Sequence, residues 1–158
     1  ASEICKSRND ARFVIVGRDN STGQEFRRDL RRLARTLGIE NSVLFLDWLD
    51  STDEFFSAID LFVSASHFES FGLAMAEAMA FAKPVAATDT AGSRELLPDD
   101  ALAEPQSPLS LCKIILDKLD DPYRLQIEGD RNKSRILENY SLEKMVLDTE
   151  KLYSKILR

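Results

Sequence analysis

The chain has 158 residues, of which 44% are hydrophobic and 30% charged, and its formal net charge at pH 7 is −6. This length and composition fit one globular domain with enough apolar side chains to bury a core. The negative charge opposes binding to nucleic acid through a general basic field. No apolar stretch approaches the roughly 18 residues that cross a bilayer, and the first residues lack the apolar centre of a secretion signal. We therefore expect a cytoplasmic location.

The chain has two cysteines, Cys5 and Cys112, which lie far apart in the sequence, and a single histidine. This spacing indicates neither a disulfide framework nor a zinc site. We expect no metal ion and no cofactor. Because the sequence begins at Ala1, with residues that suit the middle of a polar helix, we expect it to be a piece of a longer protein.

Short apolar runs rich in β-branched residues alternate with segments of helical period, and this order predicts parallel strands connected by helices. In chain order we expect a strand at 12–17, a helix at 24–37, a strand at 42–47, a short helix at 52–58, a strand at 59–66, a helix at 71–82, a strand at 83–89, a turn and short helix at 90–97, a weak strand at 101–105 and helices from 107 onward. The strands are continuous apolar runs, which is typical of an α/β sheet covered on both faces.

Ligands of such open sheets bind at the carboxyl ends of the strands, where loops lead into helices. The candidate loops are 17–23, 47–51, 66–72 and 88–93. The third loop precedes a helix with one polar side chain, Glu77, so we expect this helix to be buried on all sides. A buried carboxylate needs either a protein donor or a ligand hydroxyl.

The start of the same helix has the features of an anion site. Gly72 removes side-chain bulk where the first backbone N–H groups are unpaired and the helix dipole is positive, so this end can hold a phosphate. Glu69, in the preceding loop, suits sugar hydroxyls. Together with Glu77 these features fit a nucleotide sugar, which has a diphosphate between a sugar and a ribose. The alternative is that Glu77 pairs with a buried arginine and Glu69 is a solvated loop residue.

The sequence resembles the donor-binding half of the family 4 glycosyltransferases, whose GT-B architecture has two Rossmann-like domains facing a cleft. The resemblance is carried by FVIVG (13–17), LGIENSVLFLDWLD (37–50), the segment 58–96 with its Glu-x7-Glu core, and the closing segment 138–158. It implies a single Rossmann-like domain over residues 1–158, with a doubly wound parallel sheet and closing helices at 123–158. The first strand of the 3-2-1-4-5-6 order, which is central, would be missing, leaving two sheet halves without their shared neighbour. The N-terminal acceptor domain would be missing too.

The resemblance also implies roles for individual residues. Glu69 would be the catalytic residue that contacts the donor sugar, and Glu77 would bind the ribose. The substrate-binding backbone and side chains would further include Ser70, Phe71, Gly72 and Leu73 at the diphosphate, Asp47, Trp48 and Leu49 beside the base, Gly17 and Arg18 after the first strand, and Gly92 near the sugar and phosphates. Arg18 or Arg94 is a candidate for the phosphate charge, although an exposed salt bridge is at least as good an interpretation of each.

The resemblance implies transfer of a sugar, with retention and without a metal ion, from a nucleoside-diphosphate sugar to a glycan or glycolipid acceptor in polysaccharide or lipopolysaccharide assembly. The fragment alone would be inactive. One alternative is a sugar-nucleotide epimerase of the same architecture. A second, non-enzymatic alternative is a receiver-like signalling module with Asp47 as phosphoacceptor. The latter is disfavoured because the acidic cluster and lysine of phosphoryl chemistry are not evident.

Five arginines lie on the helix at 24–37, at positions 27, 28, 31, 32 and 35. A solvated face is the favoured interpretation, because charge-rich helices are commonly surface helices. The sharper hypothesis is docking to anionic lipid on the cytoplasmic face of a membrane.

Overall fold

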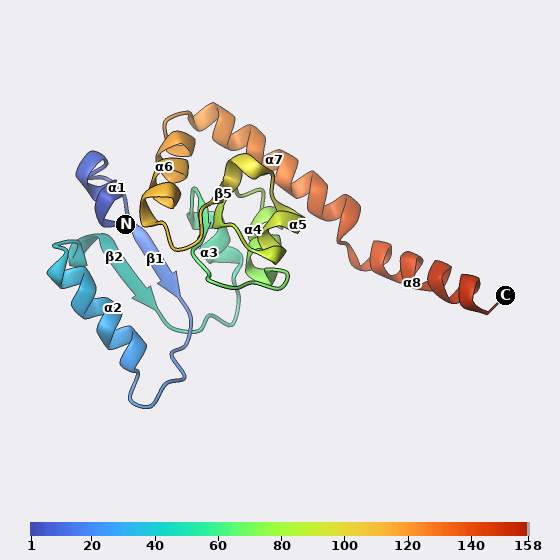
Figure 1. Ribbon diagram of the computed structural model, residues 1–158, viewed down its shortest axis with the longest axis horizontal. Helices are drawn as coiled ribbons and strands as arrows, with labels where there is room; N and C mark the ends of the chain where they lie inside the picture. Colours follow the sequence, from blue (N-terminus) through green and yellow to red (C-terminus); the bar gives the residue numbers. More distant parts are fainter. Residues whose placement is uncertain (158) are drawn as a thin grey trace. The chain divides into compact units, whose positions relative to one another are not determined.

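The computed structural model describes residues 1–157 (Figure 1). The chain divides into two compact units, Ala1–Glu54 and Phe55–Arg158. Both units contain parallel strands connected to helices, as the alternation of the sequence predicts. The α/β class is therefore confirmed. The single domain expected over residues 1–158 stays a prediction.

Unit 1 contains one parallel strand pair with a helix between its strands. Its elements are α1 (Ser2–Ser7), β1 (Phe13–Val16), α2 (Glu25–Thr36), the 3-10 turn η1 (Glu40–Ser42) and β2 (Val43–Leu46). Phe13 lies opposite Val43 and Val16 opposite Leu46, so both strands end at the same edge. The loops that follow β1 and β2 therefore begin side by side.

Unit 2 contains three parallel strands in the order β3-β4-β5. Its elements, beginning with the helix that spans the unit boundary, are α3 (Asp53–Ala58), β3 (Phe62–Ser64), α4 (Leu73–Ala80), β4 (Val85–Thr88), α5 (Ala91–Leu96), η2 (Asp99–Ala101), β5 (Leu102–Ala103), α6 (Pro108–Leu119), α7 (Pro122–Asn139) and α8 (Leu142–Ile156). Figure 1 shows α7 and α8 following one another at the end of the chain. These are the helices expected at 123–158.

The strands form two separate sheets, β1-β2 and β3-β4-β5. A 3-2-1-4-5-6 sheet without its central strand would separate into a pair and a triplet of this kind. The prediction of two sheet halves without a shared neighbour is therefore confirmed for the described residues.

The core of unit 2 surrounds β4, whose four residues are all buried. Small side chains such as Ala86 and Ala87 let helices pack closely on both faces of this strand. Met75 and Met79 of α4 and Leu96 of α5 pack in the same cluster. The strand therefore gives α4 a fixed support on one side.

Helix α7 packs against the end of α4, where Gly129 lies so close to the carbonyl of Ala82 that a Cβ there would overlap it. Asn132 donates from Nδ2 to the carbonyl of Lys83 at 2.9 Å. Lys118 of α6 and Glu128 of α7 form an ion pair at 2.5 Å, with side chains only 10% and 21% exposed. These contacts hold α4, α6 and α7 as one frame.

Within residues 1–157, no helix combines the length and apolar character needed to span a bilayer.

Candidate functional site

The turn between β3 and α4 contains the features that the sequence predicts for an anion site. Gly72 is the N-cap of α4 with φ of +94°, a left-handed conformation that favours glycine. Among the described residues, no side chain caps this helix end, and its first turn has no acidic residue. The first backbone N–H groups of α4 are therefore available to a ligand, and the positive end of the helix dipole lies with them.

Two hydrogen bonds join this turn to the next loop along the sheet. The N–H of Gly92 donates to the carbonyl of Glu69 at 2.9 Å, and the hydroxyl of Thr88 donates to the carbonyl of Ser66 at 2.5 Å. Ser93 in turn donates from Oγ to the carbonyl of Thr88 at 2.8 Å. Hydrogen bonds from the end of β4 and from α5 thus fix the loop that contains Glu69.

Gly92 lies inside α5 and is buried against the backbone of Phe71. A Cβ at this position would lie 2.7 Å from the N, Cα and C atoms of Phe71. The resemblance implies that Gly92 approaches the sugar and phosphates, which stays a prediction. The structure adds a packing requirement that sequence reasoning missed: only glycine lets α5 approach the β3–α4 turn this closely.

The prediction that the helix at 71–82 is buried on all sides is wrong. Met75, Ala78 and Met79 face the core, whereas Glu77 is exposed and Leu73 is 71% exposed. The sequence argument equated apolar composition with burial, but β4 and α7 cover only one side of α4. The Glu77 carboxylate is open to solvent, without an ion-pair or hydrogen-bond partner among the described residues.

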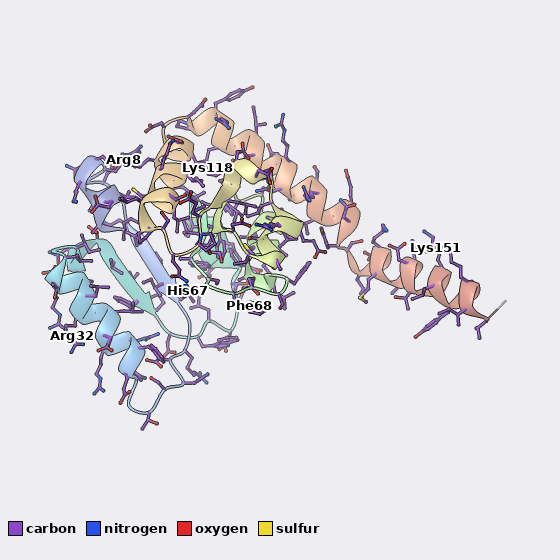
Figure 2. All side chains as sticks on the ribbon, viewed as in Figure 1. Arg8, Arg32, His67, Phe68, Lys118 and Lys151 are labelled. Carbon is purple, nitrogen blue, oxygen red and sulfur yellow. The ribbon has the colours of Figure 1, made fainter. Side chains whose placement is uncertain are left out.

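The remaining predicted residues of this turn differ in exposure. Phe71 is half-buried and packs its ring against Tyr140, with 5.5 Å between the ring centroids. Glu69 is also half-buried, whereas Ser70 is exposed. Figure 2 labels His67 and Phe68, which lie on the same loop, and both are exposed. The turn therefore has its backbone anchored through Phe71 and its polar side chains accessible.

Arg94, a candidate for the phosphate charge, already has a carboxylate partner. Its guanidinium donates to both carboxylate oxygens of Asp89, from Nε at 2.5 Å and Nη2 at 2.6 Å. This pairing lowers the pKa of Asp89 below its usual value. A phosphate would have to compete with Asp89 for this arginine.

Unit 1 brings together the other predicted residues at the carboxyl ends of β1 and β2. Gly17 follows β1 with φ of +146°, and Arg18 Nε lies 4.0 Å from Asp47 Oδ1, both side chains being exposed. The same Asp47 oxygen accepts a hydrogen bond from the backbone N–H of Trp48 at 2.8 Å. Trp48 is 65% exposed and Leu49 is half-buried. An exposed indole beside two charged side chains can stack on a flat, polar ligand.

The loop after β1 also contains a hydrogen-bond network that sequence reasoning missed. Asp19 accepts hydrogen bonds from the Ser21 hydroxyl at 2.6 Å and from the backbone N–H of Arg27 at 2.8 Å. These bonds lower the pKa of Asp19 below its usual value. Arg27 is half-buried and turned toward the strand ends, so it does not belong to the solvated arginine face. Asp19 precedes the helix by six residues, too far for an ordinary N-cap pattern to reveal it.

Among residues 1–157, no group of three or more His, Cys, Asp or Glu side chains is placed to hold a metal ion. Cys5 and Cys112 are both free thiols.

Comparison with known proteins decides the family. The family model of the glycosyl transferases group 1 matches residues 1–121, which is most of the chain. The chain belongs to the glycosyl transferases group 1. This membership covers both strand-end regions described above, the Gly17–Leu49 region of unit 1 and the β3–α4 turn of unit 2. It favours glycosyl transfer over the receiver-like module with Asp47 as phosphoacceptor.

Individual relatives cover nearly the whole of this group 1 chain. It is 32% identical over 152 residues to N-acetyl-alpha-D-glucosaminyl L-malate synthase of Bacillus anthracis, covering 94% of this chain and 39% of the relative. It is 26% identical over 163 residues to the lipopolysaccharide core biosynthesis mannosyltransferase LpsB of Rhizobium meliloti, covering 96% and 44%. The chain thus spans less than half the length of these two relatives.

A solved structure supports the fold. The crystal structure of Anabaena HepE in complex with UDP and glucose matches with a TM-score of 0.80 and 20% identity, over 98% of this chain and 52% of that one. At this identity the likeness shows the fold alone. It agrees with a Rossmann-like domain of a GT-B glycosyltransferase.

Proposed function

We propose that this chain binds a nucleoside-diphosphate sugar and forms the donor-binding part of a retaining, family 4 type glycosyltransferase. The observation that carries the proposal is the β3–α4 turn. Its helix N-terminus begins at Gly72 without a side-chain cap in the described part of the chain, and Glu69 stands next to it with its backbone anchored to Gly92. Membership of the glycosyl transferases group 1 supports the reaction class.

The diphosphate is proposed to lie on the backbone of Ser70–Leu73. When the bond between the sugar and the diphosphate breaks, negative charge grows on the leaving diphosphate. Fixed N–H groups and the helix dipole stabilise that charge without reorganising during the reaction. The resemblance to the family 4 glycosyltransferases implies transfer without an essential metal ion or cofactor, and we propose that these N–H groups supply the stabilisation instead.

The two glutamates are proposed to act on opposite sides of the diphosphate. Glu69, in the loop before the helix, contacts the donor sugar as the catalytic residue. Glu77 lies one helical turn beyond Leu73 and accepts hydrogen bonds from the ribose hydroxyls. Because its carboxylate is exposed and unpaired in the described structure, it meets a ligand without first breaking an ion pair.

The loops at the strand ends of unit 1 are proposed to border the nucleotide. Trp48 and Leu49 would flank the base, with Asp47 beside them. Arg18 is the better candidate for the phosphate charge, since its 4.0 Å contact with Asp47 is weak, whereas Arg94 is held by two short bonds. The proposal places Gly17 at the phosphates, because its backbone can approach a ligand closely.

The acceptor is proposed to be a glycan or glycolipid in polysaccharide or lipopolysaccharide assembly. The name of the relative LpsB, a lipopolysaccharide core mannosyltransferase, supports this choice. Because the chain spans less than half of that relative, we propose that an N-terminal acceptor domain of the same enzyme completes the site and that this chain alone is inactive. A GT-B sugar-nucleotide epimerase would share the donor contacts but would also need acid/base residues in its cleft.

We also propose that the enzyme works in the cytoplasm and touches an anionic membrane face through α2. Arg28, Arg31, Arg32 and Arg35 line one hollow of about 410 Å³ on this helix, together with Asp29. Arg32 is paired with Asp29 at 3.0 Å, and the Arg31 guanidinium lies 5.6 Å from the centre of the Phe45 ring. Changing Arg28 and Arg35 to Gln should weaken binding to phosphatidylglycerol vesicles, and added salt should do the same. Equal binding to neutral vesicles would refute this contact.

The donor proposal is tested by titrating the protein with UDP-, GDP- and ADP-sugars in a calorimeter. Glu77→Ala should weaken binding of the preferred donor by about 10-fold, because a charged acceptor of the ribose hydroxyls is lost. Glu143→Ala is the matched control, since Glu143 is also an exposed helix carboxylate and lies on α8. If no nucleotide sugar binds, or if both variants bind like the native protein, the proposed site is wrong.

A further inference from the structure

One guanidinium group connects the carboxyl ends of the two strands of unit 1. Arg27 donates from Nη2 to the carbonyl of Gly17 at 2.5 Å and to the carbonyl of Leu46 at 2.8 Å. Leu46 is the last residue of β2, and Gly17 directly follows β1. The direct bond between these two residues, from the Gly17 N–H to the Leu46 carbonyl, is long at 3.4 Å. Arg27 therefore makes the shorter connection between the two strand ends.

The backbone of Arg27 is itself held in place by the loop that it supports. Asp19 accepts the Arg27 N–H on Oδ2, and on Oδ1 it accepts the N–H and hydroxyl of Ser21. The Ser21 oxygen accepts the N–H of Glu25 at 2.9 Å. The N-cap residue Gln24 has a left-handed backbone, and its own side chain forms no capping bond in the described structure. Asp19 and Ser21 thus replace the missing cap and fix the start of α2.

The loops that leave these strand ends are the ones that the proposed function assigns to the nucleotide. Arg18 follows Gly17 directly, and the Asp47–Leu49 segment follows Leu46 directly. A hydrogen bond to the carbonyl that precedes each loop sets the point from which the loop departs. Arg18, Asp47 and Trp48 are exposed and Leu49 is half-buried, so core packing alone does not fix these loops, and the two bonds of Arg27 contribute to the spacing between them.

We propose that Arg27, held by Asp19, is a positioning residue of the nucleotide site. It sets the distance between the Gly17–Arg18 loop and the Asp47–Leu49 loop. It does so through two backbone carbonyls and does not itself contact the ligand. The inference rests on the proposed function for the identity of the ligand, whereas the coupling of the two loops rests on the contacts of Arg27 alone. Binding sites need such support, because small displacements of the contacting groups reduce affinity steeply.

The test uses Trp48, the only tryptophan of the sequence, as a reporter inside the second loop. Arg27→Met removes the donors but keeps a long side chain, whereas Arg27→Lys keeps the charge and a single donor group on a shorter reach. We expect Arg27→Met to lower the fluorescence anisotropy of Trp48 and to weaken binding of UDP, GDP or ADP, whichever the native protein prefers, by about 10-fold. Arg27→Lys should restore part of both signals.

The matched control is Arg32→Met, on the same helix, because the exposed ion pair of Arg32 with Asp29 touches neither loop. It should leave the Trp48 anisotropy and nucleotide affinity unchanged. Circular dichroism and thermal melting establish that each variant is folded at the assay temperature. If Arg27→Met does not fold, Asp19→Asn replaces it and should shift both signals in the same direction by a smaller factor.

The outcomes separate the two proposals. If the folded variant retains native Trp48 anisotropy, the positioning role is refuted, whatever the nucleotide affinity. If the anisotropy falls but nucleotide affinity stays native, Arg27 couples the loops without serving the site, which also refutes the proposal. If the native protein binds none of the nucleotides, the proposed function fails, and the anisotropy alone then decides whether Arg27 couples the loops.

Discussion

Replacing Gly92 by alanine tests how closely α5 and the β3–α4 turn are packed. The new Cβ would lie 2.7 Å from three backbone atoms of Phe71, whereas ordinary contacts begin near 3.4 Å. The two segments must therefore separate by about 0.7 Å, the difference between these distances. Backbone cannot rotate away as a side chain can, so the strain falls on the turn itself.

The magnitude follows from three opposing effects. Overpacking a filled site costs about 1–3 kcal/mol. Weakening the hydrogen bond from the Gly92 N–H to the Glu69 carbonyl costs about 1 kcal/mol. Alanine recovers roughly 1 kcal/mol, because it is the better helix former inside α5. The packing cost wins, and we expect Gly92→Ala to lower the free energy of unfolding by about 1–3 kcal/mol.

Urea unfolding followed by circular dichroism measures this difference, and a thermal melt should show Tm lower by roughly 2–12 °C. The control is Ala91→Ser, which adds one atom at the exposed neighbouring position and should change stability by less than about 0.5 kcal/mol. If Gly92→Ala were as stable as the native protein, or more stable through its helix propensity, the close contact with Phe71 would be refuted.

Three further changes test other parts of the structure. Ala82 has φ of +55°, which glycine adopts without strain, so Ala82→Gly should raise the free energy of unfolding by about 0.5–1 kcal/mol in urea titrations; a loss of stability would contradict this. The pKa of Asp19 is depressed in the folded protein, so its stabilising contribution is present above the unfolded pKa of about 3.9 and disappears as pH falls through the folded value. Asp19→Asn should therefore lose stability near neutral pH and approach the native protein in acid, and a constant difference across the pH series would argue against the hydrogen bonds of Asp19. Lys118→Met should cost about 2–4 kcal/mol, because it leaves the half-buried Glu128 carboxylate without its charged partner and with the long 3.4 Å hydrogen bond from the backbone N–H of Val85. The double change with Glu128→Leu should recover much of the loss; if the single and double variants were equally stable, the ion pair would not be closed in solution.

The placement of the predicted elements followed from local signals. The apolar runs around Val14, Leu44 and Ala86 all became strands, and the alternation with helical segments predicted their parallel order. Caps were also local, as at Asp121, whose carboxylate accepts the N–H groups of Tyr123 and Arg124. Such features depend on residues only a few positions apart, so the chain shows them without its fold.

The exposure of α4, by contrast, could not be predicted from residues close together in the sequence. Its residues are nearly all apolar, which suggested burial on every side, but the exposed position of Glu77 depends on where β4 and α7 lie. A helix flanked on one side by its sheet and α7 leaves the other side open, whatever its composition. Only the packing of distant segments distinguishes these two environments.

The sequence by itself determined the α/β class and the Glu69–Gly72 turn with an unpaired helix end, which rest on periodicity and on neighbouring residues. The two sheet halves followed from the resemblance to the family 4 glycosyltransferases. The tertiary structure alone decided that Gly92 packs against Phe71 and that Arg27 joins the ends of β1 and β2. These contacts connect residues 10 to 21 positions apart through specific backbone atoms. Distances of that kind come from the way strands and helices pack, and no pattern of neighbouring side chains contains them.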